Sequence, residues 1–220
     1  MPRQVDQEER RRTIAEAVCR LADELGLEGV TLRDVADRAG LSMGAVQRCF
    51  RTKDEMLVFA LRYVGARVAD RVRAQIAASP AQSARSRLGH VVTEVALLGA
   101  ERRAEARVWL AFVAQAAVAP ALAEVLRADY AALHRVLTAL VAEATGAGDG
   151  ADGAPGPERE ARALLALADG LTAQVLVGHL TAPEAREVLH HQLTALWERG
   201  ARPPEAPATS ATRDRATPGR

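Results

Sequence analysis

The chain has 220 residues, of which 49% are hydrophobic and 26% charged, and its formal net charge is +1. This length accommodates one large domain or two small ones, and the apolar fraction supports a sizeable core, so a wholly disordered chain is excluded. The near-neutral net charge does not itself indicate binding to nucleic acid, and only a local excess of positive charge can point to such a partner.

Two cysteines, Cys19 and Cys49, imply no disulfide framework and favour a reducing compartment. The N-terminal sequence has no apolar signal core, and the longest apolar run, 108–122, is shorter than the roughly 18 residues of a membrane-spanning helix. We therefore expect a soluble, cytoplasmic protein without a membrane partner.

Abundant Ala and Leu, and apolar residues at helical spacing, predict an all-α fold. Residues 1–9 are polar and are expected to lie outside the first helix, which spans about 10–25 and ends at Gly26. The apolar positions of that helix are Ile14, Val18, Leu21 and Leu25.

The segment 31–50 predicts two short helices joined by a tight turn. Thr31 is the expected N-cap of the first helix, with Asp34 completing a capping box, and Gly40 ends that helix. Ser42 is the expected N-cap of the second helix, which runs to about Phe50. Such a pair has helix-turn-helix geometry, in which the second helix enters the major groove of DNA.

The rest of the chain is also predicted to be helical. Thr52 opens a long helix that ends at Ser79-Pro80. Further helices are expected at about 82–101, 103–117, 119–145, 158–179 and 182–199. The Gly-rich stretch 146–156 predicts a flexible loop, and 201–220, which has no apolar period, predicts a disordered tail.

The second short helix carries the chemistry of base recognition. It opens with the small residues Gly44 and Ala45, and then presents Gln47 and Arg48, which can make bidentate contacts to adenine and guanine. Residues 38–53 contain four cationic side chains and no acid. Helix–turn–helix patterns also occur in purely structural bundles, but this local charge favours DNA binding. A second basic cluster, 10–12, opens the first helix.

The residues TLRDVA at 31–36, AGLS at 39–42, GAV at 44–46, Phe50 and TKDEML at 52–57 together resemble the TetR family of transcriptional regulators. The resemblance covers about residues 10–60. It implies a DNA-binding head (1–52) and a helical effector-binding and dimerisation body (53–200), followed by the tail (201–220). Short segments of the body, VWLAF at 108–112 and ADGL at 168–171, are similar to the BetI-like C-terminal domain.

From the residues and this resemblance together, we predict contacts to the DNA backbone or bases for Arg10, Arg11, Thr31, Arg33, Ser42, Gly44, Val46, Gln47, Arg48, Arg51 and Lys53. The family usually has aromatic or histidine residues where this chain has Gln47, Arg48 and Cys49. Arg48 in place of a ring suggests a more hydrogen-bonded reading of the bases.

An effector pocket is expected in the body, lined by the helical stripe Trp109, Phe112, Val113 and Ala116, with Gln115, Gln174 and Glu94 as candidate polar groups. An apolar pocket would suit a hydrophobic small molecule or an acyl chain. The same stripe is also compatible with an ordinary core.

Dimerisation is expected through the last two helices, as the family resemblance implies. The candidate interface residues are Leu164, Leu167, Leu171, Val175, Val188, Gln192 and Leu196. The alternative is that these residues complete the core of each monomer.

The predicted function is that of a ligand-responsive, sequence-specific regulator. The resemblance implies a repressor that binds a palindromic operator as a homodimer, associated with the nucleoid when bound to DNA. We expect no cofactor or metal and no enzyme activity, because the single Glu-x-x-His at 187–190 falls short of the paired sets of a di-metal bundle. A redox sensor based on Cys49, beside Arg48 and Arg51, is a competing interpretation, and so is a DNA-architectural protein with little sequence preference.

Overall fold

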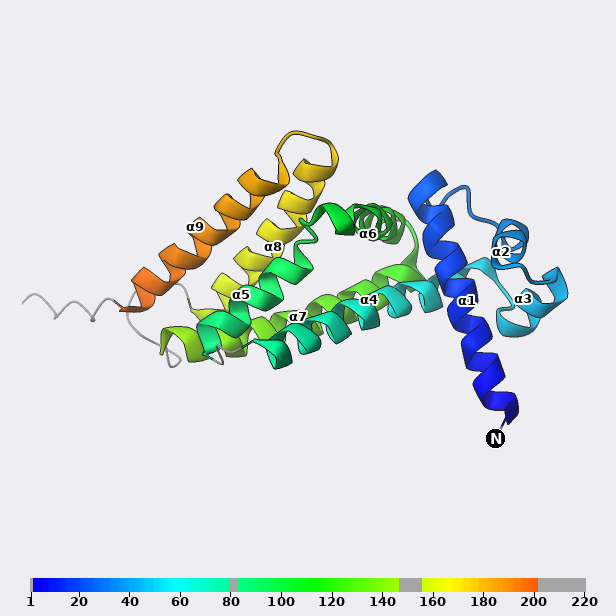
Figure 1. Cartoon of the computed structure of the whole chain (residues 1–220), viewed down its shortest axis with the longest axis horizontal. Helices are drawn as coiled ribbons and strands as arrows, with labels where there is room; N and C mark the ends of the chain where they lie inside the picture. Colours follow the sequence, from blue (N-terminus) through cyan, green and yellow to red (C-terminus); the bar gives the residue numbers. More distant parts are fainter. Residues whose placement is uncertain (1, 80–82, 147–155, 202–220) are drawn as a thin grey trace, which may run out of the picture.

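The computed structural model of the chain describes residues 2–79, 83–146 and 156–201 (Figure 1). Over these ranges every regular element is helical, which confirms the predicted fold class. The elements are α1 (Pro2–Leu25), α2 (Leu32–Ala39), α3 (Met43–Cys49), α4 (Lys53–Ala78), α5 (Ala84–Val95), the 3-10 turn η1 (Ala100–Arg102), α6 (Arg103–Ala116), α7 (Pro120–Thr145), α8 (Pro157–Leu176) and α9 (Ala182–Ala201). Residues 147–155 of the predicted loop (146–156) and residues 202–220 of the predicted tail (201–220) lie outside the described residues.

Helices α1, α2 and α3 form a head at one end of the molecule (Figure 1). The hydroxyl of Thr31 accepts from the Asp34 amide, and the Asp34 carboxylate accepts from the Thr31 amide, so the expected capping box begins α2. Gly40 ends α2 in the left-handed region (φ 67°), a backbone conformation that glycine adopts without steric cost. The Ser42 side chain then accepts from the Ala45 amide and begins α3.

Helix α4 connects the head to the body. It begins where the Thr52 hydroxyl accepts from the Glu55 amide, and then runs the length of the body beside α7 (Figure 1). Helices α5, α6, α8 and α9 lie on one side of these two long helices. None of the described helices has both the length and the apolar character that crossing a bilayer requires.

Two hydrophobic cores hold the helices together. The first joins the head and the start of α4 to α6 and the first half of α7, with Phe50, Met56 and Phe112 among its largest members. The second joins α5, the second half of α7, α8 and α9 around Leu137 and Leu164. The first core therefore crosses the domain boundary proposed at residue 52.

Two helix boundaries differ most from the sequence-based expectation. Helix α1 begins at Pro2 rather than near residue 10, and its polar start carries the i,i+4 ion pairs Asp6–Arg10 and Glu8–Arg12, which support helical turns. The helix expected over 82–101 ends at Val95.

The early end of α5 has a tertiary cause. The Thr172 hydroxyl of α8 donates to the Ala96 carbonyl over 2.7 Å. Leu97 then adopts a positive φ of 48° and is buried. Contacts with α8 thus turn the chain where the local sequence would continue the helix.

Candidate DNA-binding surface and effector cavity

Helix α3 has one buried and one exposed face. Ala45, Val46 and Cys49 are buried against the rest of the head. Ser42, Gly44, Gln47 and Arg48 are exposed. Val46 is 0% exposed and packs in the first core. Its side chain does not reach the surface, so Val46 is a core residue and not the DNA contact that was predicted. The outward face of α3 is polar, as base recognition requires.

Arg33, Arg48 and Arg51 are exposed, and none of them forms an ion pair with any residue in the described ranges. Arg38 differs, because its two terminal nitrogens donate to the two carboxylate oxygens of Glu24, each over 2.7 Å. These hydrogen bonds lower the pKa of Glu24. The local cationic excess is therefore smaller than the sequence window suggests.

The other basic residues predicted to bind DNA have partners within the protein. Arg10 pairs with Asp6, with Nη2 and Oδ2 3.1 Å apart. The half-buried Arg11 guanidinium lies over two aromatic rings, 4.7 Å from the centroid of Phe50 and 4.5 Å from that of Phe59. Lys53 Nζ donates to the Glu28 carbonyl over 3.2 Å.

Because of these contacts, Arg11 and Lys53 are interpreted first as structural residues of the head. The Arg11 stack ties α1 to the end of α3 and to α4, and the Lys53 bond ties α4 to the loop before α2. Both residues support the structure of the head, whatever contact they make with phosphates. The hydroxyls of Thr31 and Ser42 are likewise engaged as helix caps.

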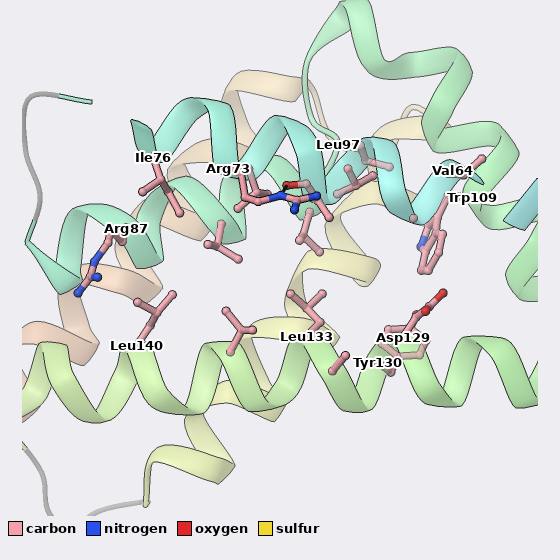
Figure 2. Close-up of a pocket in the computed structure, with 18 of the residues that line it drawn as sticks. Val64, Arg73, Ile76, Arg87, Leu97, Trp109, Asp129, Tyr130, Leu133 and Leu140 are labelled. Atoms are coloured by element: carbon pink, nitrogen blue, oxygen red, sulfur yellow. Dashed lines mark hydrogen bonds between the residues drawn. The ribbon is translucent and has the colours of Figure 1, made fainter. Parts of the chain in front are cut away.

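The body contains a cavity of about 790 Å³ between α4, α5 and α7 (Figure 2). This volume lies within the range of pockets for drug-sized ligands, about 300–1,000 Å³. The lining is mostly apolar, and its larger aliphatic members are Val64, Val68, Val72, Ile76, Val91, Val95, Leu97, Leu133, Val136 and Leu140. Trp109, Asp129 and Tyr130 lie at one end, and Arg87 lies at the other, near Ile76 (Figure 2).

The aromatic end of the cavity is organised around Asp169. Its carboxylate accepts from the Tyr130 hydroxyl over 2.6 Å and from Trp109 Nε1 over 3.3 Å. The two rings meet edge to face with centroids 5.9 Å apart. Burial and the hydrogen bond to Asp169 raise the pKa of Tyr130, so its hydroxyl keeps its proton and remains a donor.

Asp129 lies beside this aromatic pair and lines the cavity. Its side chain is exposed and makes no hydrogen bond or ion pair within the described part of the chain. Partial desolvation by the surrounding protein raises the pKa of Asp129, although the charge of Arg62 acts in the opposite sense. The cavity thus holds one accessible carboxylate without a partner.

Of the predicted pocket residues, only Trp109 lines the cavity. Phe112 and Ala116 are buried in the first core, and Val113 packs against it, so these three positions belong to the core. Gln115 is half-buried and Gln174 is exposed, and neither lines the cavity. The stripe on α6 is therefore mainly a packing surface.

Sequence reasoning missed Asp129, Tyr130 and Asp169. Asp169 had a detectable signal, because it is the one charged residue in the stretch 163–178. A single acid in an apolar helical pattern is costly to bury without a partner, which makes it a candidate for a specific contact. Asp129 and Tyr130 follow Arg127 in a mixed segment and carried no such signal.

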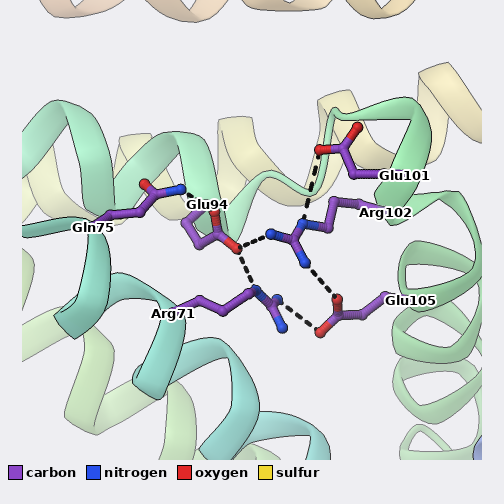
Figure 3. Close-up of polar contacts among 6 residues, drawn as sticks. All are labelled: Arg71, Gln75, Glu94, Glu101, Arg102 and Glu105. Carbon is purple, nitrogen blue, oxygen red and sulfur yellow. Dashed lines mark hydrogen bonds and ion pairs between the residues drawn. The ribbon is translucent and has the colours of Figure 1, made fainter. Parts of the chain in front are cut away.

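Glu94 is not available to a ligand, because it is buried and its carboxylate is engaged in a network of ion pairs with half-buried arginines (Figure 3). It accepts from Arg71 Nε over 2.5 Å and from Gln75 Nε2 over 3.0 Å, and it pairs with Arg102 over 3.3 Å. Arg71 also donates to Glu105 over 2.8 Å. The network joins α4 to α5, η1 and α6.

The candidate dimer residues divide into two groups. Leu164, Leu171 and Leu196 are buried in the second core of the monomer, so these three are corrected from candidate interface residues to core residues, the alternative given above. The remaining four are half-buried or exposed: Leu167, Val175, Val188 and Gln192. Val188 is 42% exposed, and Val177, just after α8, is 79% exposed.

Two family models match the chain. Residues 14–58 match the model of bacterial regulatory proteins of the tetR family, and residues 84–198 match the model of the C-terminal part of BetI-type transcriptional repressors. The transcriptional regulator PksA of Bacillus subtilis is 40% identical over 116 residues, which cover 53% of this chain and 56% of PksA. The regulator BetI of Escherichia coli is 31% identical over 149 residues, which cover 65% of this chain and 72% of BetI.

Solved structures agree with these matches. A transcriptional regulator from Rhodococcus superposes with a TM-score of 0.74 at 31% identity, covering 86% of this chain and 96% of that one. A transcriptional regulator from Saccharomonospora viridis, solved in complex with choline, gives a TM-score of 0.74 at 25% identity, covering 85% and 96%. The chain belongs to the TetR family of bacterial DNA-binding transcriptional regulators, which are not enzymes, and its body is of the BetI type.

Proposed function

We propose that the chain is a homodimeric, effector-responsive repressor that binds a palindromic operator through α3. The observation that carries this proposal is the two-faced α3, whose inner face is fixed in the head core while Gln47 and Arg48 point outward without ion-pair partners in the described ranges. Side chains held in this way are ready to contact base edges. Ser42, Gly44, Arg33 and Arg51 are the proposed additional contacts.

A palindromic operator requires two heads related by a two-fold axis. We place that axis at α8 and α9, the last two described helices, which lie at the edge of the body (Figure 1). The exposed Val188 and the half-buried Leu167, Val175 and Gln192 are the proposed contacts with the second copy. An apolar side chain as exposed as Val177 also favours this surface.

The cavity is the proposed effector site, and its apolar lining suits a hydrophobic small molecule. The choline bound to the regulator from Saccharomonospora viridis supports a small-molecule site in this fold. Helix α4 lines the cavity and also begins in the head, so a ligand that prefers one position of α4 shifts the population of DNA-competent dimers.

Selection from a library of random duplex DNA, followed by sequencing at two salt concentrations, tests this function. We expect enrichment of a two-fold palindrome and an affinity that falls steeply with salt. The control is a Gln47→Ala, Arg48→Ala double variant, which should lose the enrichment but keep the melting temperature because both side chains are exposed. Tight binding without any enriched sequence would indicate an architectural protein and contradict the proposal.

A further inference from the structure

The charges around the cavity are balanced at one end only. Arg87 pairs with Glu143, and Arg73 pairs with Asp70 over 2.5 Å, so both cationic groups on the lining are already neutralised. Asp129 and Asp169 form no ion pair in the ranges that the structure describes. The aromatic end of the cavity therefore carries two carboxylates that form no ion pair, and Arg62, whose charge acts on Asp129, lies outside the lining.

The groups at this end match the needs of an organic cation. The Trp109 and Tyr130 rings meet edge to face beside Asp129, and ring faces attract quaternary ammonium groups. The Tyr130 hydroxyl and Trp109 Nε1 both donate to Asp169, which fixes the carboxylate and leaves the rings beside the cavity. Asp129 is accessible and has no competing partner among the described residues.

The cavity is also much longer than an ammonium group. Asp129 and Leu140 both line it from α7, and their separation of 11 positions in the chain corresponds to roughly 16 Å along the helix axis. The lining over this length is apolar, apart from the two paired arginines. A ligand that fills the cavity therefore has an apolar tail as well as a head.

We propose that the effector is an amphipathic organic cation whose ammonium head lies at Asp129, Trp109 and Tyr130 and whose apolar tail extends between α4, α5 and α7. This inference rests on the proposed function and specifies the ligand class of its effector site. It is distinct from recognition of a small polar cation, because most of the lining contacts the tail.

The test uses three probes with the full-length chain, each below its micelle concentration. Decyltrimethylammonium has the head and the tail, choline has a head alone, and decyl sulfate has the same tail with the opposite charge. Binding is measured by calorimetry and by fluorescence of Trp109 in a Trp197→Phe background, where Trp109 is the one remaining tryptophan. We expect decyltrimethylammonium to bind at least ten-fold more tightly than either of the other probes.

A matched pair of variants then tests the carboxylate. Asp129→Asn should weaken binding of decyltrimethylammonium at least ten-fold, whereas Glu124→Gln, which replaces an exposed acid on the same helix outside the cavity lining, should leave it unchanged. Melting temperatures establish that both variants fold. Equal affinity for decyl sulfate, absence of cation binding, or an unchanged affinity in Asp129→Asn would each overturn the proposal.

Operator binding separates this proposal from the proposed function. A protein that selects a palindrome but ignores decyltrimethylammonium would overturn the ligand class and leave the regulator intact. A protein that binds the cation through Asp129 but selects no DNA would support the ligand class and contradict the regulatory function.

Discussion

Arg107 on α6 and Asp23 on α1 form an ion pair, with Nε and Oδ1 2.5 Å apart. Two residues further along α6, Trp109 lines the cavity. One short stretch of α6 thus contacts both the DNA-binding head and the proposed effector site.

This relationship predicts an effect on regulation rather than on stability. In Arg107→Ala, operator affinity without effector should change little, because Arg107 is exposed, Asp23 is only half-buried, and solvent screens such a pair. The change in operator affinity caused by decyltrimethylammonium, about 5–150-fold for typical coupled sites, should shrink towards one. Fluorescence anisotropy of labelled operator measures both quantities. The control is Arg135→Ala, which removes an exposed arginine on α7. If decyltrimethylammonium changes operator affinity equally in the two variants, the Arg107–Asp23 pair does not connect the effector site to the head.

Arg48 is proposed to contact bases and Arg33 to contact phosphates, so their removal should change operator binding in different ways. Arg48→Ala should cost about 1–3 kcal/mol of operator binding and relax the preference at one position in each half-site. Arg33→Ala should weaken all sequences equally and reduce the slope of the salt dependence by about 1. Competition between operator variants at several salt concentrations distinguishes these outcomes. An Arg48→Ala protein that keeps its base preference at every position would refute direct reading by Arg48.

The stack of Arg11 on Phe50 and Phe59 predicts a stabilising role in the head. Arg11→Ala should lower the free energy of unfolding by about 1–2 kcal/mol, the range for cation–π contacts that are partly desolvated. Urea denaturation measures this loss. Arg12→Ala is the control, since Arg12 is exposed and pairs with Glu8 one turn away. If Arg11→Ala instead keeps its stability and loses operator affinity, Arg11 acts on DNA.

The ion pairs of the buried Glu94 predict a larger loss of stability. Glu94→Gln leaves Arg71 and Arg102 with fewer acceptors, and breaking a buried pair typically costs about 3–5 kcal/mol. Glu143→Gln, which breaks the more exposed pair with Arg87, should cost less than about 1 kcal/mol. Chemical denaturation compares the two variants directly. Similar losses in both would show that the network contributes little beyond a surface pair.

The raised pKa of Asp129 predicts that its ionised carboxylate destabilises the folded protein in a pH-dependent way. The folded state holds this proton more tightly than the unfolded state, so stability falls as pH rises from the unfolded carboxyl pKa, about 4, through the higher folded value. Asp129→Asn should therefore melt at a higher temperature than the parent at pH 7, and the difference should disappear near pH 4. Glu124→Gln is the control, and a parent that melts above Asp129→Asn at pH 7 would show that an unseen partner stabilises the charge.

Local chemistry explains which parts of this structure the sequence could predict. Thr31, Asp34 and Gly40 act within one short helix, so the residue types alone defined the start and end of α2. The buried residues of α3 face inward, and Val46 is one of them, although it was predicted among the DNA contacts.

Tertiary contacts explain what the sequence could not predict. Arg38 is neutralised by Glu24, which is 14 residues away, and α5 ends early because Thr172 binds the Ala96 carbonyl. The cavity depends on which faces of α4, α5 and α7 meet, and Asp169 lies 39 residues from Tyr130 in the chain. No local pattern encodes such pairings.

The hydrophobic core that the head shares with α6 and α7 limits how this regulator can be re-engineered. Transplanting residues 1–52 as a cassette onto another body would leave Phe50 and its neighbours facing a surface that they were not shaped to fit. A chimaera made in this way should fold poorly unless α6 and the first half of α7 move with the cassette. Gln47 and Arg48 make no contribution to that core, so operator preference is better retargeted by grafting these outward positions alone.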